Sequence, residues 1–421
     1  MEHRAHAVSL AGVLSLVAVA ACGVAGGEAW QGTVRDSAGI QIVENPATGS
    51  WTEEDRWRLE EEMRIGTAEG EPEYQFSSLI AVEVGEDGFI YALDQQGQHI
   101  KVFDPHGKYV RTIGRPGSGL GELSPGLQAG GLALIPGDTL LVLDQGNARF
   151  ARFLTDGTND GSFRIDFAET GFPFRIEPGP DGGMIAQMRR ISMPGAAGGD
   201  SLDRVVRLSS DGEPIDTLLS MPSGNTFRLS GGAPQWEFFS PEPLWSVRPA
   251  GGVLFAINSE YRIEMRDSTG RVEKVVTRPF TRELVTDGHA DRMRDAIVEI
   301  ARRQAGQPLP PQVLRMMRAN MNFAPHYPVM GFVATGPENS IWVQQVRSVA
   351  DLSASELENF DIQLDLAAPR WDVFDHEGRY LGIVEMPGRI QLFDIERDAF
   401  YGVARDEFDV QYIVRLRLER P

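Results

Sequence analysis

The chain has 421 residues and a formal net charge of −20, from 60 acidic residues against 40 Lys and Arg. So acidic a surface repels nucleic acid and anionic lipid headgroups, and we expect no nucleic acid as a partner. The single cysteine excludes an internal disulfide, so the fold must be held by its apolar core, for which the chain is long enough.

Residues 1–21 have the pattern of an export signal. Arg4 precedes an apolar run from about Ala7 to Ala21, which is too short for a comfortable membrane span and ends on small residues. The sole cysteine, Cys22, follows directly. This arrangement resembles the lipobox of bacterial lipoproteins, in which the signal is cut before a Cys that carries the lipid. The alternative is an ordinary signal peptide followed by a chance Cys.

The residues after Cys22 favour an attachment to the cell envelope. Residues 22–35 are small and polar, and we interpret them as the lipidated Cys and a tether. Position 23 is Gly rather than the Asp that retains many lipoproteins at the inner membrane. We therefore expect an outer-membrane lipoprotein that faces the periplasm or the exterior.

The rest of the chain, residues 36–421, repeats a unit that contains two strand–turn–strand signals. The first signal, an apolar run, a Gly/Asp/Pro turn and a second run, occurs six times, at 80–94, 132–144, 174–187, 245–258, 331–345 and 390–404. The second signal, whose turn ends in Gly, follows the first five, at 101–114, 151–163, 205–219, 263–276 and 371–384. Four strands in each repeated unit are typical of a propeller blade.

The sixth unit is incomplete, because residues 408–419 supply only a third strand before the chain ends. Residues 56–66 near the N-terminus form a strand without a hairpin partner. Pairing the two chain ends closes a ring and hides two sheet edges. The sequence therefore predicts an all-β, six-bladed β-propeller with four-stranded antiparallel blades, in preference to seven blades, a β-helix or a β-sandwich.

Three excursions interrupt the repeat. Residues 223–245 contain Phe227, Trp236, Phe238, Phe239 and Trp245, and aromatic loops over a propeller mouth either hold a ligand or pack onto the blades. Residues 346–369 form an acidic loop inside blade five. Apolar residues at helical spacing predict a helical insertion at about 283–322, between blades four and five. The net charge of +2 on residues 281–323 marks either a partner surface or, as we favour, balanced surface charges.

No catalytic constellation is evident. The five histidines after the signal lack zinc spacing, and His326, which enters blade five, is the best candidate for a site. Asp94, Asp144, Asn258 and Gln344 end comparable second strands. The first three are calcium-type ligands, although such residues also bond their own backbone. Our candidate residues are Trp236, Phe239, His326 and Trp342 for a ligand and Asp94, Asp144 and Asn258 for a metal.

Residues 80–163 resemble the NHL-repeat and TolB-like class of propellers. The resemblance rests on "FIYALDQQGQHIKVFDPHGKYVRTIGRPGSGLGEL", and less closely on "LLVLDQGNARFARFLTDG". The whole mature chain resembles six-bladed propeller lipoproteins of bacteria, which share a "DSAGIQIVEN"-like opening and an "EYRIEMRDSTG"-like fourth blade. Blades three, five and six depart from the repeat pattern.

The resemblance implies the fold and leaves the activity open. We expect a monomeric, envelope-anchored binding module for a protein, peptide or glycan. We identify no catalytic constellation and favour a protein that is not an enzyme and has no cofactor, with calcium left open. The alternatives are a calcium-dependent hydrolase or lyase with its site in the central channel, and a structural envelope protein without a small ligand.

Overall fold

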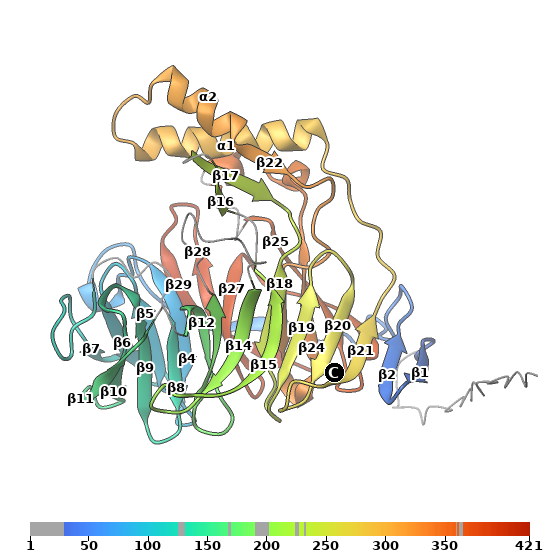
Figure 1. The fold of residues 1–421 in the computed structure, drawn as a ribbon, viewed down its shortest axis with the longest axis horizontal. Helices are drawn as coiled ribbons and strands as arrows, with labels where there is room; N and C mark the ends of the chain where they lie inside the picture. Colours follow the sequence, from blue (N-terminus) through green and yellow to red (C-terminus); the bar gives the residue numbers. More distant parts are fainter. Residues whose placement is uncertain are drawn as a thin grey trace, which may run out of the picture.

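The computed structural model describes residues 29–124, 131–166, 170–189, 202–223, 227–230, 233–358, 360–361 and 365–421. In these residues the chain forms a six-bladed β-propeller, and four of the blades are four-stranded antiparallel sheets made of consecutive strands (Figure 1). Cys22 and the expected signal lie outside the described residues. No helix among the described residues is long and apolar enough to cross a membrane.

The strands of the first three blades follow one another without long insertions. Blade one contains β4 (Leu79–Val84), β5 (Ile90–Asp94), β6 (His99–Phe103) and β7 (Tyr109–Ile113). Blade two contains β8 (Leu132–Ile135), β9 (Thr139–Asp144), β10 (Arg149–Leu154) and β11 (Asn159–Arg164). Blade three contains β12 (Phe172–Pro178), β13 (Met184–Arg189), β14 (Leu202–Leu208) and β15 (Pro214–Pro222).

The last three blades carry the additions. Blade four contains β18 (Pro243–Val247), β19 (Val253–Ile257), β20 (Arg262–Arg266) and β21 (Val272–Thr277). Blade five contains β23 (Phe332–Thr335), β24 (Ile341–Val346), β25 (Ala367–Phe374) and β26 (Tyr380–Glu385). Blade six contains β27 (Ile390–Glu396), β28 (Ala399–Arg405), β29 (Gln411–Glu419) and β3 (Arg58–Ile65).

The ring closes as the sequence predicted. Strand β3 pairs antiparallel with β29, with Ile65 opposite Ile413, so blade six is shared between the two ends of the chain. The side chain of Gln411 reinforces this closure, because its Oε1 accepts the backbone N–H of Leu79 at 2.6 Å and so ties blade six to blade one.

The glycines of the second turns also behave as predicted. All five have positive φ, between 79° and 95°, which a side chain would strain. They are Gly107, Gly157, Gly212, Gly270 and Gly378.

The apolar core is divided among the blade interfaces. Each pair of neighbouring blades encloses a cluster of buried side chains, including the cluster between blades six and one. The interface of blades five and six contains Trp342 and Trp371, whose ring centroids are 6.4 Å apart. This arrangement makes every blade depend on both neighbours, so the ring is held by hydrophobic burial without a disulfide.

An N-terminal hairpin widens blade four. Strands β1 (Thr33–Ser37) and β2 (Ile40–Glu44) extend it to six strands, because β2 pairs parallel with β21. Strand β1 begins within the last residues of the expected tether. Asn45 fastens the hairpin: its Nδ2 donates to the carbonyl of Gly378 at 2.9 Å, and its Oδ1 accepts the N–H of Tyr380 at 2.7 Å. Asn45 ends the "DSAGIQIVEN" segment, which thus has a structural role.

The excursions build a separate layer over one end of the ring, which we call the cap. Its small sheet contains β16 (Phe227–Ser230), β17 (Ala233–Phe238) and β22 (Met321–Phe323), and β17 pairs parallel with β22. The helices α1 (Asp287–Gln304) and α2 (Pro311–Ala319) cover this sheet (Figure 1).

Local sequence sets the ends of the two cap helices. The Thr286 side chain accepts the N–H of His289 at the start of α1, and Pro311 occupies the first turn of α2. The cap has its own apolar cluster, which includes Met293 of α1. This cluster also takes in side chains from the loop inside blade five, where α3 (Ala354–Glu358) lies, so the cap is attached to blade five.

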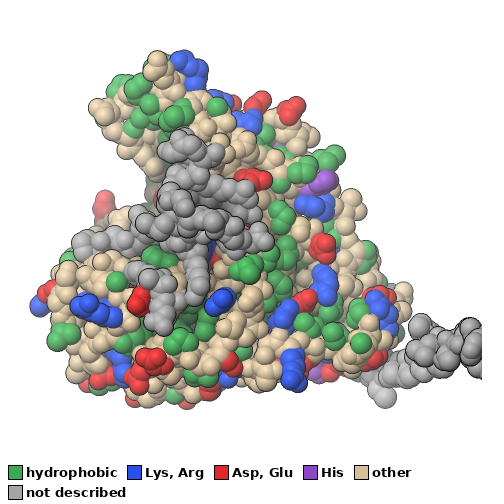
Figure 2. Space-filling view, in the orientation of Figure 1, with side chains coloured by type: hydrophobic (Ala, Val, Ile, Leu, Met, Phe, Trp, Pro, Cys, Tyr) green, Lys and Arg blue, Asp and Glu red, His purple; other side chains and the backbone are tan. Residues whose placement is uncertain are grey.

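Acidic and basic side chains alternate over the surface of the blades (Figure 2). Many of them form ion pairs, such as Arg64 with Glu61 and Arg405 with Asp409. Hydrophobic side chains reach the surface of the helical hairpin, where Met316 of α2 is 47% exposed. The hairpin also shows the balanced charges that the sequence favoured, for example Arg294 with Asp291.

Candidate functional site

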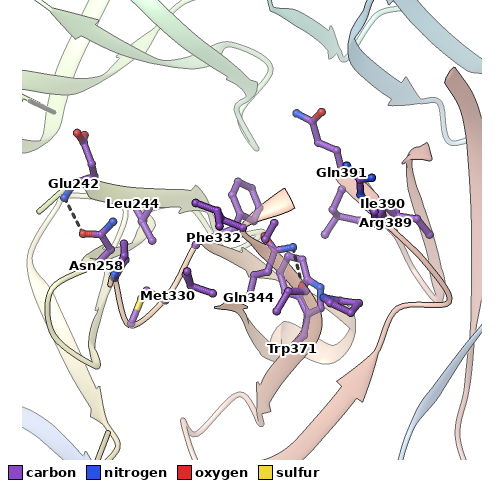
Figure 3. A pocket seen from close by; sticks show the side chains of 18 of the residues that line it. Glu242, Leu244, Asn258, Met330, Phe332, Gln344, Trp371, Arg389, Ile390 and Gln391 are labelled. Carbon is purple, nitrogen blue, oxygen red and sulfur yellow. Dashed lines mark hydrogen bonds between the residues drawn. The ribbon is translucent and has the colours of Figure 1, made fainter. Parts of the chain in front are cut away.

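A cavity of about 470 Å³ lies at the end of the propeller channel that faces the cap. Its walls come from blades four, five and six, and Phe238 and Phe239 of the cap contribute to it (Figure 3). The blade residues are short runs at or just before the starts of β18, β23, β25 and β27, together with positions at the ends of β19, β24 and β28. A volume in this range is typical of sites for small ligands or ligand side chains.

The wall of the cavity is mainly apolar. Leu244, Met330 and Phe332 face the same space as Trp371 in Figure 3. Met330 and Trp371 are almost completely buried, at 0% and 1% exposure, so their positions are set by the blade core behind them. The ring of Phe332 packs edge-on against Trp371, with centroids 6.1 Å apart. The result is a rigid apolar wall rather than a loose loop surface.

Two amide side chains on the wall serve the fold. The Oδ1 atom of Asn258 accepts the backbone N–H of Glu242 at 2.8 Å. The Nε2 atom of Gln344 donates to the carbonyl of Ala368 at 3.2 Å. Both bonds are drawn in Figure 3. Asn258 directly follows β19, and Gln344 lies within β24. Their bonds hold the segments around Glu242 and Ala368, which also line the cavity.

Two arginines line the cavity, and each has an acidic partner. Arg389 pairs with the fully buried Asp365, and Arg405 pairs with Asp409 at 2.7 Å. Burial raises the pKa of Asp365, while the hydrogen bond from the N–H of Asp361 and the charge of Arg389 oppose that rise. Each of the two arginine charges on the wall is therefore balanced by an acidic partner.

Two buried donors on the wall are unpaired. The indole Nε1–H of Trp371 and the Nε–H of Arg389 have no hydrogen-bond partner within the described part of the chain. A buried donor without a partner costs about 1–3 kcal/mol, so such groups need an explanation. Both side chains line the cavity, but these two N–H groups are themselves buried and are not presented to it.

Phe239 is held in an unusual conformation. Its φ of 64° lies in the left-handed region, which disfavours side chains other than Gly, Asn and Asp. The phenyl ring packs on Tyr327 with centroids 4.6 Å apart, and Tyr327 is part of the cap cluster. The strained backbone therefore places an aromatic ring at the junction of cap and cavity.

Carboxylates line the channel farther from the cap. Glu83 accepts the N–H of Leu134, and Asp394 accepts the N–H of Val84, so each joins the inner strand of its own blade to that of the next. Glu177 does the same with the N–H of Val247.

The proximity of these carboxylates changes their acidity. Burial and then the charge of Asp394 raise the pKa of Glu83 well above its usual range. Burial and then the charge of Glu396 raise the pKa of Asp394 to about 7. Among the described residues, no group of three or more His, Cys, Asp and Glu side chains is arranged to hold a metal ion.

The predicted ligand residues are dispersed. Phe239 lines the cavity, whereas Trp236, His326 and Trp342 do not. Trp236 lies on β17 in the cap, and His326 forms an isolated bridge with Leu284. Trp342 is fully buried between blades five and six. The side chain of Phe227 lies outside the described residues.

The predicted metal ligands lie in three different blades. Asp94 is buried and accepts the N–H groups of Ser77 and Ser78. Asp144 is also buried and pairs with Arg149 at 2.9 Å. Asn258 alone lines the cavity. The calcium site stays a prediction, and these contacts give all three residues the alternative role of holding strand ends.

The sequence did not single out Phe332, Trp371 or Arg389 as site residues. They occupy ordinary strand and loop positions of blades five and six, and only the curvature of the ring brings them together. The one available signal was the recurrence of Asn258 and Gln344 at equivalent positions, since both line the cavity.

No protein-family model and no curated protein matches the chain. Solved structures of similar fold include a Bacteroides fragilis protein described as a "putative exported protein" (11% identity, TM-score 0.49, covering 90% of this chain and 100% of that one). A DUF4221 family member from Bacteroides vulgatus has 11% identity and a TM-score of 0.48, covering 88% and 100%. The PQQ-bound aldose sugar dehydrogenase of Streptomyces coelicolor has 13% identity and a TM-score of 0.45, covering 87% and 99%.

These identities are low, and the class of the protein rests on its own strand pairing. It is a six-bladed β-propeller with a capped cavity at one end of its channel.

Proposed function

We propose that the protein is an envelope-anchored binding module, and that its ligand, a protein segment, peptide or glycan, enters the cavity between the cap and blades four to six. The cavity is the single observation that carries this proposal. It is concave, mainly apolar, and built on rigid strands, as binding sites generally are. Asn258, Gln344 and Arg389 on its wall are bonded to other groups of the protein, which suits recognition by shape.

The anchor belongs to the same proposal. Cleavage before Cys22 and its lipidation would leave a short tether ahead of β1, in a lipoprotein of the NHL-repeat and TolB-like class at the outer membrane. The β1–β2 hairpin extends the outer edge of blade four at the rim of the ring, whereas the cap helices lie over one end of the ring (Figure 1).

The anchor is tested by growing cells that express the full chain with radiolabelled palmitate. We expect label on the wild type and none on Cys22→Ser, with the variant lost from the membrane fraction. Label on neither protein, with both secreted, would favour an ordinary signal peptide.

The binding site is tested by narrowing the cavity. Gly388 lines it, and a Cβ added there meets no atom within 4 Å, so Gly388→Leu should obstruct the cavity without disturbing the fold. Gly288, on α1 outside the cavity, is a matched control, because its Cβ meets only the Thr286 hydroxyl at 3.7 Å.

The readout is the thermal shift of full-length protein against a panel of short peptides and oligosaccharides. We expect at least one compound to stabilise the wild type and Gly288→Leu but not Gly388→Leu. Equal stabilisation of all three proteins would place the binding site elsewhere and contradict the proposal.

A further inference from the structure

We infer that the ligand group held in this cavity is an uncharged, apolar side chain of a peptide, such as that of Leu or Phe. This inference rests on the proposed function and narrows it, because a protein, a peptide and a glycan make different demands on the wall of a site.

The charge on the wall argues against a charged ligand. Arg389 is committed to Asp365, which is completely buried, and Arg405 is committed to Asp409. A ligand cation would meet two arginines, and a ligand carboxylate would lie close to the acidic group already paired with each guanidinium. Transfer of either charge into an apolar cavity is costly without a free partner. An uncharged group avoids both penalties.

The apolar surfaces of the cavity have the shape to enclose a side chain. Leu244, Phe239 and Phe332 come from blade four, the cap and blade five, so an inserted group would be surrounded on several sides. A sugar ring would instead present many hydroxyls to this wall, each needing a hydrogen-bond partner.

The polar groups that remain suit a peptide unit next to the side chain. Gln391, which is exposed on the cavity lining, offers a carboxamide with both a donor and an acceptor. One apolar group and a few amide contacts describe a peptide better than a sugar.

The test uses small probes whose binding to the full chain is followed by ligand-observed NMR titration. The apolar probes are N-acetyl-leucinamide and N-acetyl-phenylalaninamide. The charged probes are N-acetyl-aspartamide and N-acetyl-lysinamide, and methyl β-glucoside represents a glycan. We expect the apolar amides to bind at least tenfold more tightly than the other three, and Gly388→Leu, but not Gly288→Leu, to abolish this binding.

A second pair of variants probes the wall itself. Leu244→Ala removes apolar surface from the cavity and should weaken N-acetyl-leucinamide about threefold to tenfold, because contact area with the ligand is lost. Leu120→Ala makes the same change at a residue that is 71% exposed and outside the cavity, and should leave binding unchanged.

The outcomes separate the inference from the proposed function. If the glucoside or a charged amide binds as tightly as the apolar amides, and Gly388→Leu still blocks it, the site stands and the inference is overturned. If no probe and no panel compound is sensitive to Gly388→Leu, both are overturned.

Discussion

The ring of blades and the cap are built in different ways, although both belong to one chain. In the ring, each apolar cluster is shared by two neighbouring blades, and the two chain ends pair in blade six. The cap has a single cluster of its own and a three-stranded sheet in which β17 and β22 pair in parallel. The ring is therefore expected to unfold as one cooperative unit and the cap to open separately.

The largest expected loss of stability follows the removal of a buried ion pair in the ring, and we compare it with the removal of an exposed ion pair in the cap. Asp372 is completely buried and accepts hydrogen bonds from Tyr261 at 2.6 Å, Tyr380 at 2.8 Å and Arg278 at 2.8 Å, so it joins blades four and five. Asp372→Ala leaves a buried cation unpaired and should lower the free energy of unfolding by about 3–5 kcal/mol. Urea denaturation measures this loss in the free energy of unfolding.

The matched change in the cap is Asp291→Ala. Asp291 is 67% exposed and pairs with Arg294, so its loss should cost about 0.2–1 kcal/mol at most. Similar losses for the Asp372 and Asp291 variants would contradict the distinction between ring and cap.

The next effect tests whether the cap opens independently. Met293 is fully buried in the cap cluster, and Met293→Ala should remove about 2–5 kcal/mol from the stability of the cap. Hydrogen exchange should then show faster exchange in α1 with little change in β5 of blade one. Ile263→Ala, at the interface of blades four and five, should instead accelerate exchange throughout the ring. Uniform acceleration by the Met293 variant would show that cap and ring are one unit.

A smaller effect concerns the pH dependence of the stability of the ring. Asp394 has a folded pKa of about 7 against an ordinary value of 3.8, so the folded state binds its proton more tightly than the unfolded state. The stabilisation that protonated Asp394 contributes is complete below about pH 4 and is lost as the pH rises through about 7. Glu83, Glu177 and Glu396 face it in the channel and act in the same direction by repulsion.

Asp394→Asn should therefore reduce the fall in Tm of the wild type between pH 5 and pH 8, by a few degrees. The amide can still accept the N–H of Val84. Asp398→Asn, at a 55% exposed carboxylate, is the control and should keep the profile of the wild type. An unchanged profile in Asp394→Asn would mean that this group does not titrate in the range expected.

The smallest effect tests the backbone of Phe239. Because its φ is 64°, Phe239→Gly should be more stable than Phe239→Ala by about 1 kcal/mol, since Gly adopts this conformation freely. Thermal unfolding of the two variants makes the comparison. Both lose the phenyl ring and should bind N-acetyl-phenylalaninamide more weakly than the wild type. Greater stability of the Ala variant would rule out strain at this position.

Much of the ring could be predicted from the sequence. The repeated turns specify hairpins locally, and the glycines at 107, 157, 212, 270 and 378 mark the positions with positive φ. The incomplete sixth unit and the unpartnered strand at 56–66 also predicted the closure through β3 and β29. These features depend on short-range pattern and on the need to pair exposed strand edges.

The cap and the cavity could be predicted only in part. The helical insertion follows from apolar periodicity, but the parallel pairing of Trp236 with Met321 joins segments 85 residues apart and leaves no periodic signal. The cavity is made by single side chains such as Phe332 and Trp371 at strand positions that look like core positions in the sequence. Their grouping arises from the geometry of the closed ring.

The central claim is that the cavity between the cap and blades four to six is the ligand site. The most direct test is a crystal of the protein soaked with N-acetyl-4-bromophenylalaninamide, with the bromine located by its anomalous signal. The account predicts a peak among Phe239, Leu244 and Trp371, and none in Gly388→Leu crystals. A peak elsewhere on the molecule, with the cavity empty, would contradict it.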